Sequence, residues 1–256
     1  MKRFALLKLA LLHVLIATLW LANLTAVAQL PGADSPAGVN AILTKLFGNI
    51  TAFSAKADVR VVDKSQKETM NVVMNFALLE NKVRVEIDMA QMKTKNLPAG
   101  AGESMKQMGM DRIVSIIRPD KKVMYIIYPG MQSYLNMPLP KEEVDALEKN
   151  PKIEKTALGK ETIDKHLCVK NKVVITDDKG QKNEAIVWNA TDLQDFPVQI
   201  QTLEKENTVV MRYRDVQFAR PDAKQFDPPA GFAEYSDVSQ LMQGVMKKMM
   251  SGQVPQ

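Results

Sequence analysis

The chain has 256 residues, a length that allows one large domain or two small ones. Apolar residues make up 46% and charged residues 25%, values typical of a folded globular protein, and a single cysteine excludes a disulfide framework. The formal charge is +5, but without the first 28 residues 31 basic side chains face 29 acidic ones. Because so small an excess cannot neutralise a phosphate backbone, we expect no nucleic-acid partner.

The first 28 residues have the pattern of a secretory signal peptide. Three basic residues begin the segment, an apolar run covers 9–22, and Ala26 and Ala28 place small side chains at the cleavage-recognition positions. The run is shorter than the roughly 20 residues needed to span a bilayer, which disfavours the rival interpretation of an uncleaved anchor. We expect cleavage between Ala28 and Gln29. No cysteine stands at that site, so the mature chain is expected in the periplasm or outside the cell without a lipid anchor.

Amphipathic helices are predicted near both ends of the mature chain. Asp34 followed by Pro36 is a helix start, and apolar residues then recur at spacings of three and four up to Ile50. The same spacing returns over 238–249, after a serine and an aspartate that can cap a helix. Each apolar stripe needs a surface to cover.

Between the helices the apolar residues alternate with a period of two, which indicates β-strands with one wet face. The short linkers between neighbouring runs favour antiparallel hairpins. No Pro-, Gly- or Ser-rich linker divides the series, so we expect one domain over 29–256. The eleven expected strands cover residues 53–62, 69–78, 83–89, 112–117, 122–128, 131–137, 152–162, 167–177, 181–189, 196–203 and 208–218.

The two middle strands, 112–117 and 122–128, are apolar on both faces, which is typical of strands covered on both sides. We expect Ile116 to share a face with Met124 and Ile126. The two terminal helices are the available cover for the second face. The regular spacing of the strands therefore predicts one large twisted sheet or barrel with helices packed on it.

Residues 118–135 resemble the periplasmic lipoprotein-carrier family LolA and its relatives LolB and LppX. The closing segment 226–232 resembles the ends of many uncharacterised secreted bacterial domains of the same build. The Arg-Pro pair that LolA carriers place after the second strand is missing from 78–82. The matching parts are the Asp120-Lys121 turn, Tyr125 and Tyr128-Pro129.

The resemblance implies an α+β fold in which a single large curved antiparallel sheet of about eleven strands forms an open half-barrel. Amphipathic N- and C-terminal helices would cover its concave side, and a hydrophobic cavity would hold acyl chains. A rival interpretation is that the same apolar side chains simply fill the core. The residues expected to line the cavity are Met70, Val72, Met74, Phe76, Val85, Ile87, Met89, Ile116, Met124, Ile126, Leu43 and Phe47.

Residues 93–111 lack strand alternation and contain several glycines and methionines. A loop of this length inside a compact domain is often a lid or a binding element, although a mobile surface loop is an equal alternative. A short helix is expected within it over 103–108. Thioether sulfur also suits Cu(I), but no histidine joins the cluster, so we expect no metal. The expected lid residues are Met92, Met105, Met108 and Met110.

His166 and Cys168 are the only histidine and cysteine of the mature chain. A nucleophilic cysteine needs a base that is oriented by a third group, and the sequence places no such group clearly. A cysteine on a strand is more often a small buried apolar residue. Glycine-rich phosphate loops and the common hydrolase and metalloprotease motifs are missing from the sequence. We therefore expect neither an enzyme nor a cofactor.

The combined pattern favours an extracytoplasmic, non-catalytic carrier or binding protein. The expected partner is a lipid, an acyl chain or a lipid-modified protein, with contact to a membrane surface, and the chain is expected to be a monomer. The alternative is an envelope protein-interaction or sensing module on the same fold, because a fold does not fix a function.

Overall fold

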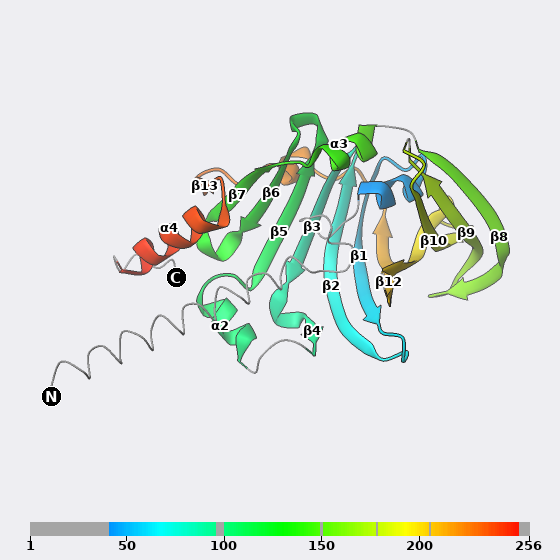
Figure 1. Cartoon of the computed structure of the whole chain (residues 1–256), viewed down its shortest axis with the longest axis horizontal. Helices are drawn as coiled ribbons and strands as arrows, with labels where there is room; N and C mark the ends of the chain where they lie inside the picture. The colour runs from blue at the N-terminus through cyan, green and yellow to red at the C-terminus, as the bar shows by residue number, and fades with distance from the viewer. Residues whose placement is uncertain (1–40, 96–99, 149–150, 178, 205, 251–256) are drawn as a thin grey trace.

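The computed structural model describes residues 41–95, 100–148, 151–177, 179–204 and 206–250. They form one curved sheet with short helices on it, as Figure 1 shows. The expected signal peptide, its cleavage site between Ala28 and Gln29 and the start of the N-terminal helix lie outside the described residues.

The sheet has 13 strands, and all eleven expected strands are present. The predicted α+β fold with one large open antiparallel sheet is confirmed. Two short strands, β4 and β13, were not expected from the sequence because neither is long enough to show alternation. The strands are β1 (Ala52–Val62), β2 (Glu68–Leu79), β3 (Lys82–Asp88), β4 (Lys93–Thr94), β5 (Arg112–Arg118), β6 (Val123–Tyr128), β7 (Ser133–Pro138), β8 (Lys152–Ile163), β9 (His166–Thr176), β10 (Lys182–Ala190), β11 (Phe196–Glu204), β12 (Asn207–Gln217) and β13 (Ala233–Tyr235).

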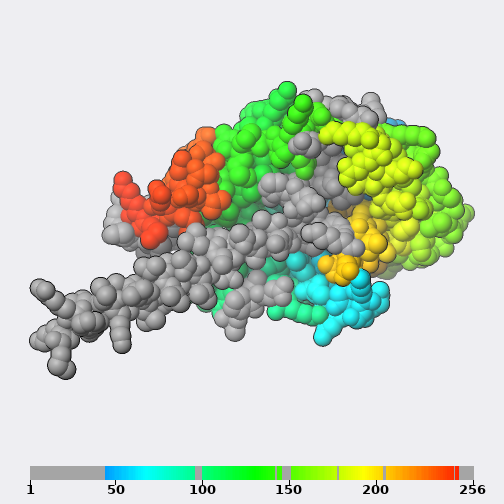
Figure 2. Space-filling view, in the orientation of Figure 1, coloured from blue at the N-terminus to red at the C-terminus, as the bar shows by residue number. Residues whose placement is uncertain are grey.

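The strand order is β13-β7-β6-β5-β3-β2-β1-β12-β11-β10-β9-β8, with β4 paired to β2. Neighbouring strands are antiparallel except β13 and β7, which are parallel. Strand β1 pairs with β12, so the first strand of the sheet is the seam between its two halves. Figure 2 shows α4 (Val238–Met250) at one end of the molecule and the strands β8 and β9 at the other.

Strand β8 ends the sheet, and its side chains are exposed from Lys152 to Thr162. Its pairing with β9 shifts register between Ala157 and Gly159, where the ladder is irregular. Lys155 and Lys160 are exposed on this strand and make no ion pair with any residue that the structure describes. The edge of the half-barrel is therefore long, charged and interrupted.

Short helices pack on the concave side of the sheet. A 3₁₀ helix, η2 (Ala41–Phe47), lies inside its curve, in the described part of the predicted N-terminal amphipathic helix (Figure 1). Helix α3 (Lys141–Glu148) packs against η2, and α2 (Ala101–Gln107) packs beside the turn after β3. Helix α4 contacts β7 and β13 and buries Leu241 in the concave core, as the C-terminal apolar stripe predicts.

The expected face of Ile116 is wrong. The register pairs Ile116 with Tyr125 and Ile117 with Met124, so Ile116 lies on the convex face and Met124 on the concave one. The β5–β6 turn contains the 3₁₀ helix η4 (Pro119–Lys121) followed by Lys122 at a φ of 55°. This left-handed residue sets the register, and a slip of one residue exchanges the two faces.

The convex apolar face is covered by residues 219–232, here called the strap. Phe226 of the strap is fully buried against Leu79, Ile116 and Tyr125. Phe47 of η2 and Leu241 of α4 lie in the concave core, on the side where the terminal helices were expected. The strap, which follows β12 directly, covers the convex face and was not predicted. The middle strands are thus covered on both faces, as their apolar pattern predicts.

Arg118 fastens the strap to the sheet. Its guanidinium donates to both carboxylate oxygens of Asp120, at 2.9 and 2.8 Å, and to the backbone carbonyl of Phe226 at 3.0 Å. It also pairs with the carboxylate of Asp227, which Lys121 contacts at 2.7 Å. The hydrogen bond from Arg118 lowers the pKa of the Asp120 carboxyl, and charge attraction acts in the same direction.

Replacing Arg118 should loosen the strap. We expect Arg118→Gln to lower the free energy of unfolding by about 1–3 kcal/mol, because hydrogen bonds to charged groups are lost while Asp120 and Asp227 stay partly solvated. The lowered pKa of Asp120 stabilises the fold above the unfolded-state pKa of about 4 and loses this effect as the pH falls through the folded-state pKa. Urea unfolding at neutral and acidic pH should therefore show a smaller acid sensitivity in the variant.

Arg214→Gln is the matched control, since Arg214 pairs with Asp58 at 2.6 Å on the surface and touches no part of the strap. A loss of stability equal to that of Arg118→Gln would contradict the role of Arg118.

Candidate functional site

The concave face carries the apolar wall that the sequence predicts. Met74 of β2 lies opposite Ile87 of β3, and Phe76 lies opposite Val85. Met70 is partly buried on the same side of β2, whereas the side chain of Leu43 lies outside the described part of the chain. Within the concave core the structure brings together Val72, Met74, Phe76, Val85, Ile87, Met89, Met124 and Phe47, with Ile126 partly buried against them.

An aromatic cluster fills the curve of the sheet beside η2. The ring centroid of Phe47 lies 4.7 Å from that of Phe53, 5.6 Å from that of Phe196 and 5.7 Å from that of Tyr213. Phe76 also belongs to it, 5.4 Å from Phe53. Burial raises the pKa of the Tyr213 hydroxyl, which stays uncharged at neutral pH. This part of the predicted cavity is therefore occupied by the protein's own rings.

A pocket of about 660 Å³ opens beside this cluster, between η2, β8 and the turn from β10 to β11. Its apolar lining comes from Leu46, Phe47, Ile50 and Phe218. The volume falls within the range of roughly 300–1,000 Å³ that ligand sites occupy. Gly48, Ala52 and five polar side chains complete the lining, the polar ones being Asn49, Thr51, Lys155, Gln194 and Asp195.

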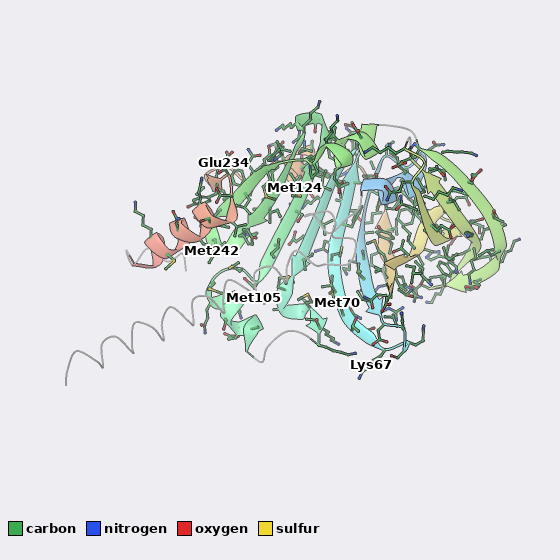
Figure 3. The ribbon with its side chains drawn as sticks, viewed as in Figure 1. Lys67, Met70, Met105, Met124, Glu234 and Met242 are labelled. Carbon is green, nitrogen blue, oxygen red and sulfur yellow. The ribbon has the colours of Figure 1, made fainter. Side chains whose placement is uncertain are left out.

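The other half of the concave face is rich in methionine. Met92, Met105 and Met108 are partly buried against the same core as the strand residues, and Met110 is buried within it. The predicted lid and the predicted wall therefore share one apolar cluster. Figure 3 labels Met70, Met105, Met124 and Met242 on four separate elements of this half.

Residues 100–111, here called the methionine segment, contact the sheet through one glycine. A Cβ on Gly109 would lie 2.7 Å from the carbonyl carbon of Gly130, in the 3₁₀ helix η5 (Pro129–Met131) between β6 and β7. Gly109 also has a φ of 69°, which other residues rarely adopt. The amide of Met110 donates to the carbonyl of Met105 at 2.8 Å. The segment is held at its C-terminal end, while its function as a lid stays a prediction.

A second recess, of about 710 Å³, lies on the convex side between the strands and the strap. Its charged side chains neutralise each other in pairs: Lys56 contacts Asp215 at 3.0 Å, and Arg84 contacts Glu86 at 2.8 Å. This pairing leaves little charge to attract a ligand, so the recess is the weaker candidate of the two.

His166 and Cys168 do not form a nucleophile and base. The thiol of Cys168 is fully buried and donates to the backbone carbonyl of His166 at 3.3 Å, while the imidazole Nδ1 of His166 contacts Asp192 at 2.8 Å. Burial raises the pKa of the Cys168 thiol, which keeps it protonated. Among the described residues, no three His, Cys, Asp or Glu side chains gather in a way that would hold a metal ion.

The polar rim of the pocket at η2 was not predicted. Lys155 belongs to β8 and Asp195 to the turn before β11, and the two become neighbours only when the sheet curls. Neither lies in a local motif, so no sequence pattern signals this rim. The apolar lining residue Phe218 was expected only as the end of a strand.

Replacing Gly109 should displace the methionine segment. We expect Gly109→Ala to lower the free energy of unfolding by about 1–3 kcal/mol for two reasons. The added Cβ clashes with the backbone of Gly130, and alanine at position 109 must adopt an unfavourable positive φ. Gly102→Ala, within α2, is the control: a Cβ there meets nothing within 4 Å and should stabilise the helix by about 0.5–1 kcal/mol. Urea unfolding measures both. Equal stability of the two variants would contradict the close approach of Gly109 and Gly130.

Among the described residues, no helix is both long and apolar enough to cross a membrane. No protein-family model matches the sequence, and no curated protein matches it.

Solved structures similar to this chain include a LolA superfamily protein from Nitrosomonas europaea, with 12% identity, 73% of this chain and 95% of that chain covered, and a TM-score of 0.35. Mycobacterium tuberculosis lipoprotein LppX is 12% identical, with 68% of this chain and 91% of LppX covered and a TM-score of 0.38. LprF from Mycobacterium bovis is 13% identical, with 75% of this chain and 96% of LprF covered and a TM-score of 0.39.

Proposed function

We propose that the protein binds the acyl chain of a lipid or lipid-modified protein on the concave side of its sheet and carries it without making or breaking a bond. The observation that carries this proposal is the pocket of about 660 Å³, whose mixed polar and apolar lining includes Phe47 of the aromatic cluster. An acyl chain removes its surface from water by lying on such a lining, and each buried methylene contributes roughly 0.8 kcal/mol.

The methionine half of the concave face supports the same function. Met92, Met105 and Met108 are unbranched, partly exposed side chains on elements outside the central strands. Methionine adapts its shape to irregular apolar ligands, because its side chain is flexible and polarisable. We propose that this half adjusts to the part of a ligand that extends beyond the pocket, with the segment 93–111 moving as a lid.

The proposed binding role includes no catalytic step. The buried thiol of Cys168 is held protonated, and the polar groups at the pocket are solvated side chains on its rim. Release of the ligand would then follow from movement of η2 or the lid rather than from chemistry.

Uptake of a fluorescent fatty acid by the delipidated mature chain tests this proposal. We expect saturable binding, and we expect Ile50→Glu to weaken it by at least tenfold, because the new carboxylate places a charge in the apolar lining. Leu203→Glu is the control, since Leu203 is 74% exposed and lies in the β11–β12 hairpin outside the pocket. The proposal fails if the wild type takes up no probe, or if Ile50→Glu binds as the wild type does.

We further propose that the chain is exported and that residues 29–256 act as one domain in the periplasm or outside the cell. Expression of the full chain in a Gram-negative host should yield a protein that begins at Gln29, as determined by N-terminal sequencing of the osmotic-shock fraction. Ala28→Arg should block this cleavage, because a large charged side chain does not fit the cleavage-recognition position. Recovery of the uncleaved wild-type chain in the cytosol would contradict the proposed compartment.

A further inference from the structure

The rim of the pocket at η2 carries one positive and one negative side chain. Lys155 extends from β8, and Asp195 lies in the turn between β10 and β11. Both are exposed, and within the described part of the chain neither forms an ion pair, with the other or with a third residue. Most other charged groups near these strands are paired, as Lys170 is with Glu161 and Lys172 with Glu184.

Lys155 lies on the concave side of β8. The register places it opposite Val173, which is fully buried in the concave core, so both side chains belong to the inner face of the curl. The ammonium group of Lys155 therefore lies at the border between the apolar lining and water. A long aliphatic stem with a charged tip suits such a border.

The backbone of Asp195 is held in place from below. Its carbonyl accepts a hydrogen bond of 2.7 Å from the side-chain amide of Asn189, which is 5% exposed and accepts in turn from Asn171 at 3.0 Å. Asp195 and its neighbour Gln194 both have positive φ values, 57° and 55°. Two successive residues in this conformation fix a tight turn, so the backbone that carries the Asp195 carboxylate is held at the rim.

From this arrangement we infer that the pocket selects an amphiphile whose headgroup carries both charges, a phosphate facing Lys155 and an ammonium facing Asp195. The inference rests on the proposed function and adds the class of headgroup to it. A headgroup with a single charge would be attracted by one of the two side chains and repelled by the other. A headgroup with both charges gains from each.

The neutral polar residues of the rim fit the same ligand. Asn49, Thr51 and Gln194 offer amide and hydroxyl groups that can donate to phosphate oxygens or accept from an ammonium. Phe47, Ile50 and Phe218 line the same pocket and offer apolar contacts for the chain. The pocket thus combines polar and apolar side chains, and a single-chain phospholipid needs both kinds for its headgroup and tail.

Displacement of the fluorescent fatty acid by three amphiphiles with the same palmitoyl-length chain tests the inference. The probes are a lysophosphatidylethanolamine, palmitate and hexadecylamine, used below their micelle concentrations on the delipidated mature chain. We expect the lysophosphatidylethanolamine to bind about two- to fivefold more tightly than either singly charged probe, because exposed charge pairs contribute modestly.

Charge-removing variants should shift this selectivity in opposite directions. Lys155→Gln is expected to bring the affinity for hexadecylamine level with that for the zwitterion, and Asp195→Asn to do the same for palmitate. Lys160→Gln is the matched control, because it removes an exposed, unpaired lysine from the same strand outside the pocket. Both positions are exposed, so the variants should fold as the wild type does, which circular dichroism checks.

The outcomes separate the two proposals. If none of the three amphiphiles displaces the probe, the proposed function and the headgroup assignment are both wrong. If all three bind equally in the wild type, or if Lys155→Gln and Asp195→Asn leave their order unchanged, the acyl-chain function stands and the headgroup assignment is wrong. A selectivity change in Lys160→Gln equal to that in Lys155→Gln would also overturn the assignment, because it would reflect overall charge.

Discussion

The pairing of β1 with β12 holds the two halves of the molecule together. Val59 lies opposite Met211 and Ala57 opposite Tyr213 across this seam, and all four side chains are buried in the concave core. Without it, β1–β7 and β8–β12 would be two separate meanders, each with another open edge. The seam also brings Phe53 beside Tyr213, so the aromatic cluster and the pocket above it exist only when this distant pairing has formed. Contacts between such remote segments form late, because the loop between them must close first.

The two faces of the curved sheet are covered to different extents. The convex face is sealed, since the strap lies over Ile116 and Tyr125 and is fastened by Arg118. The concave face is covered only in parts by η2, α2, α3 and α4, which leaves methionines and the pocket lining partly exposed. The two faces therefore differ: the strap covers the convex wall, and the concave face keeps partly exposed apolar side chains.

The strand pattern was predictable from the sequence because side-chain alternation is a local property. All eleven strands follow from it, and so does the C-terminal helix. The face of Ile116 was not predictable, because the left-handed conformation of Lys122 in the turn sets the register of β6. Met74, Val85 and Ile87 lie in the concave core because the alternation on β2 and β3 puts them on one face, while their role in lining a ligand cavity stays a prediction. The pocket rim was missed because Lys155 and Asp195 meet only through the curvature of the whole sheet.

The outer edge of β8 affects whether copies of the chain aggregate through their sheets. A long strand with free backbone groups is a template on which a second chain can extend the ladder, and open sheets are prone to aggregate in this way. Here the shift between Ala157 and Gly159 breaks the regular spacing of those groups, and Lys155 and Lys160 would bring like charges together if two edges met. The sheet can thus stay open without polymerising through its own edge strand.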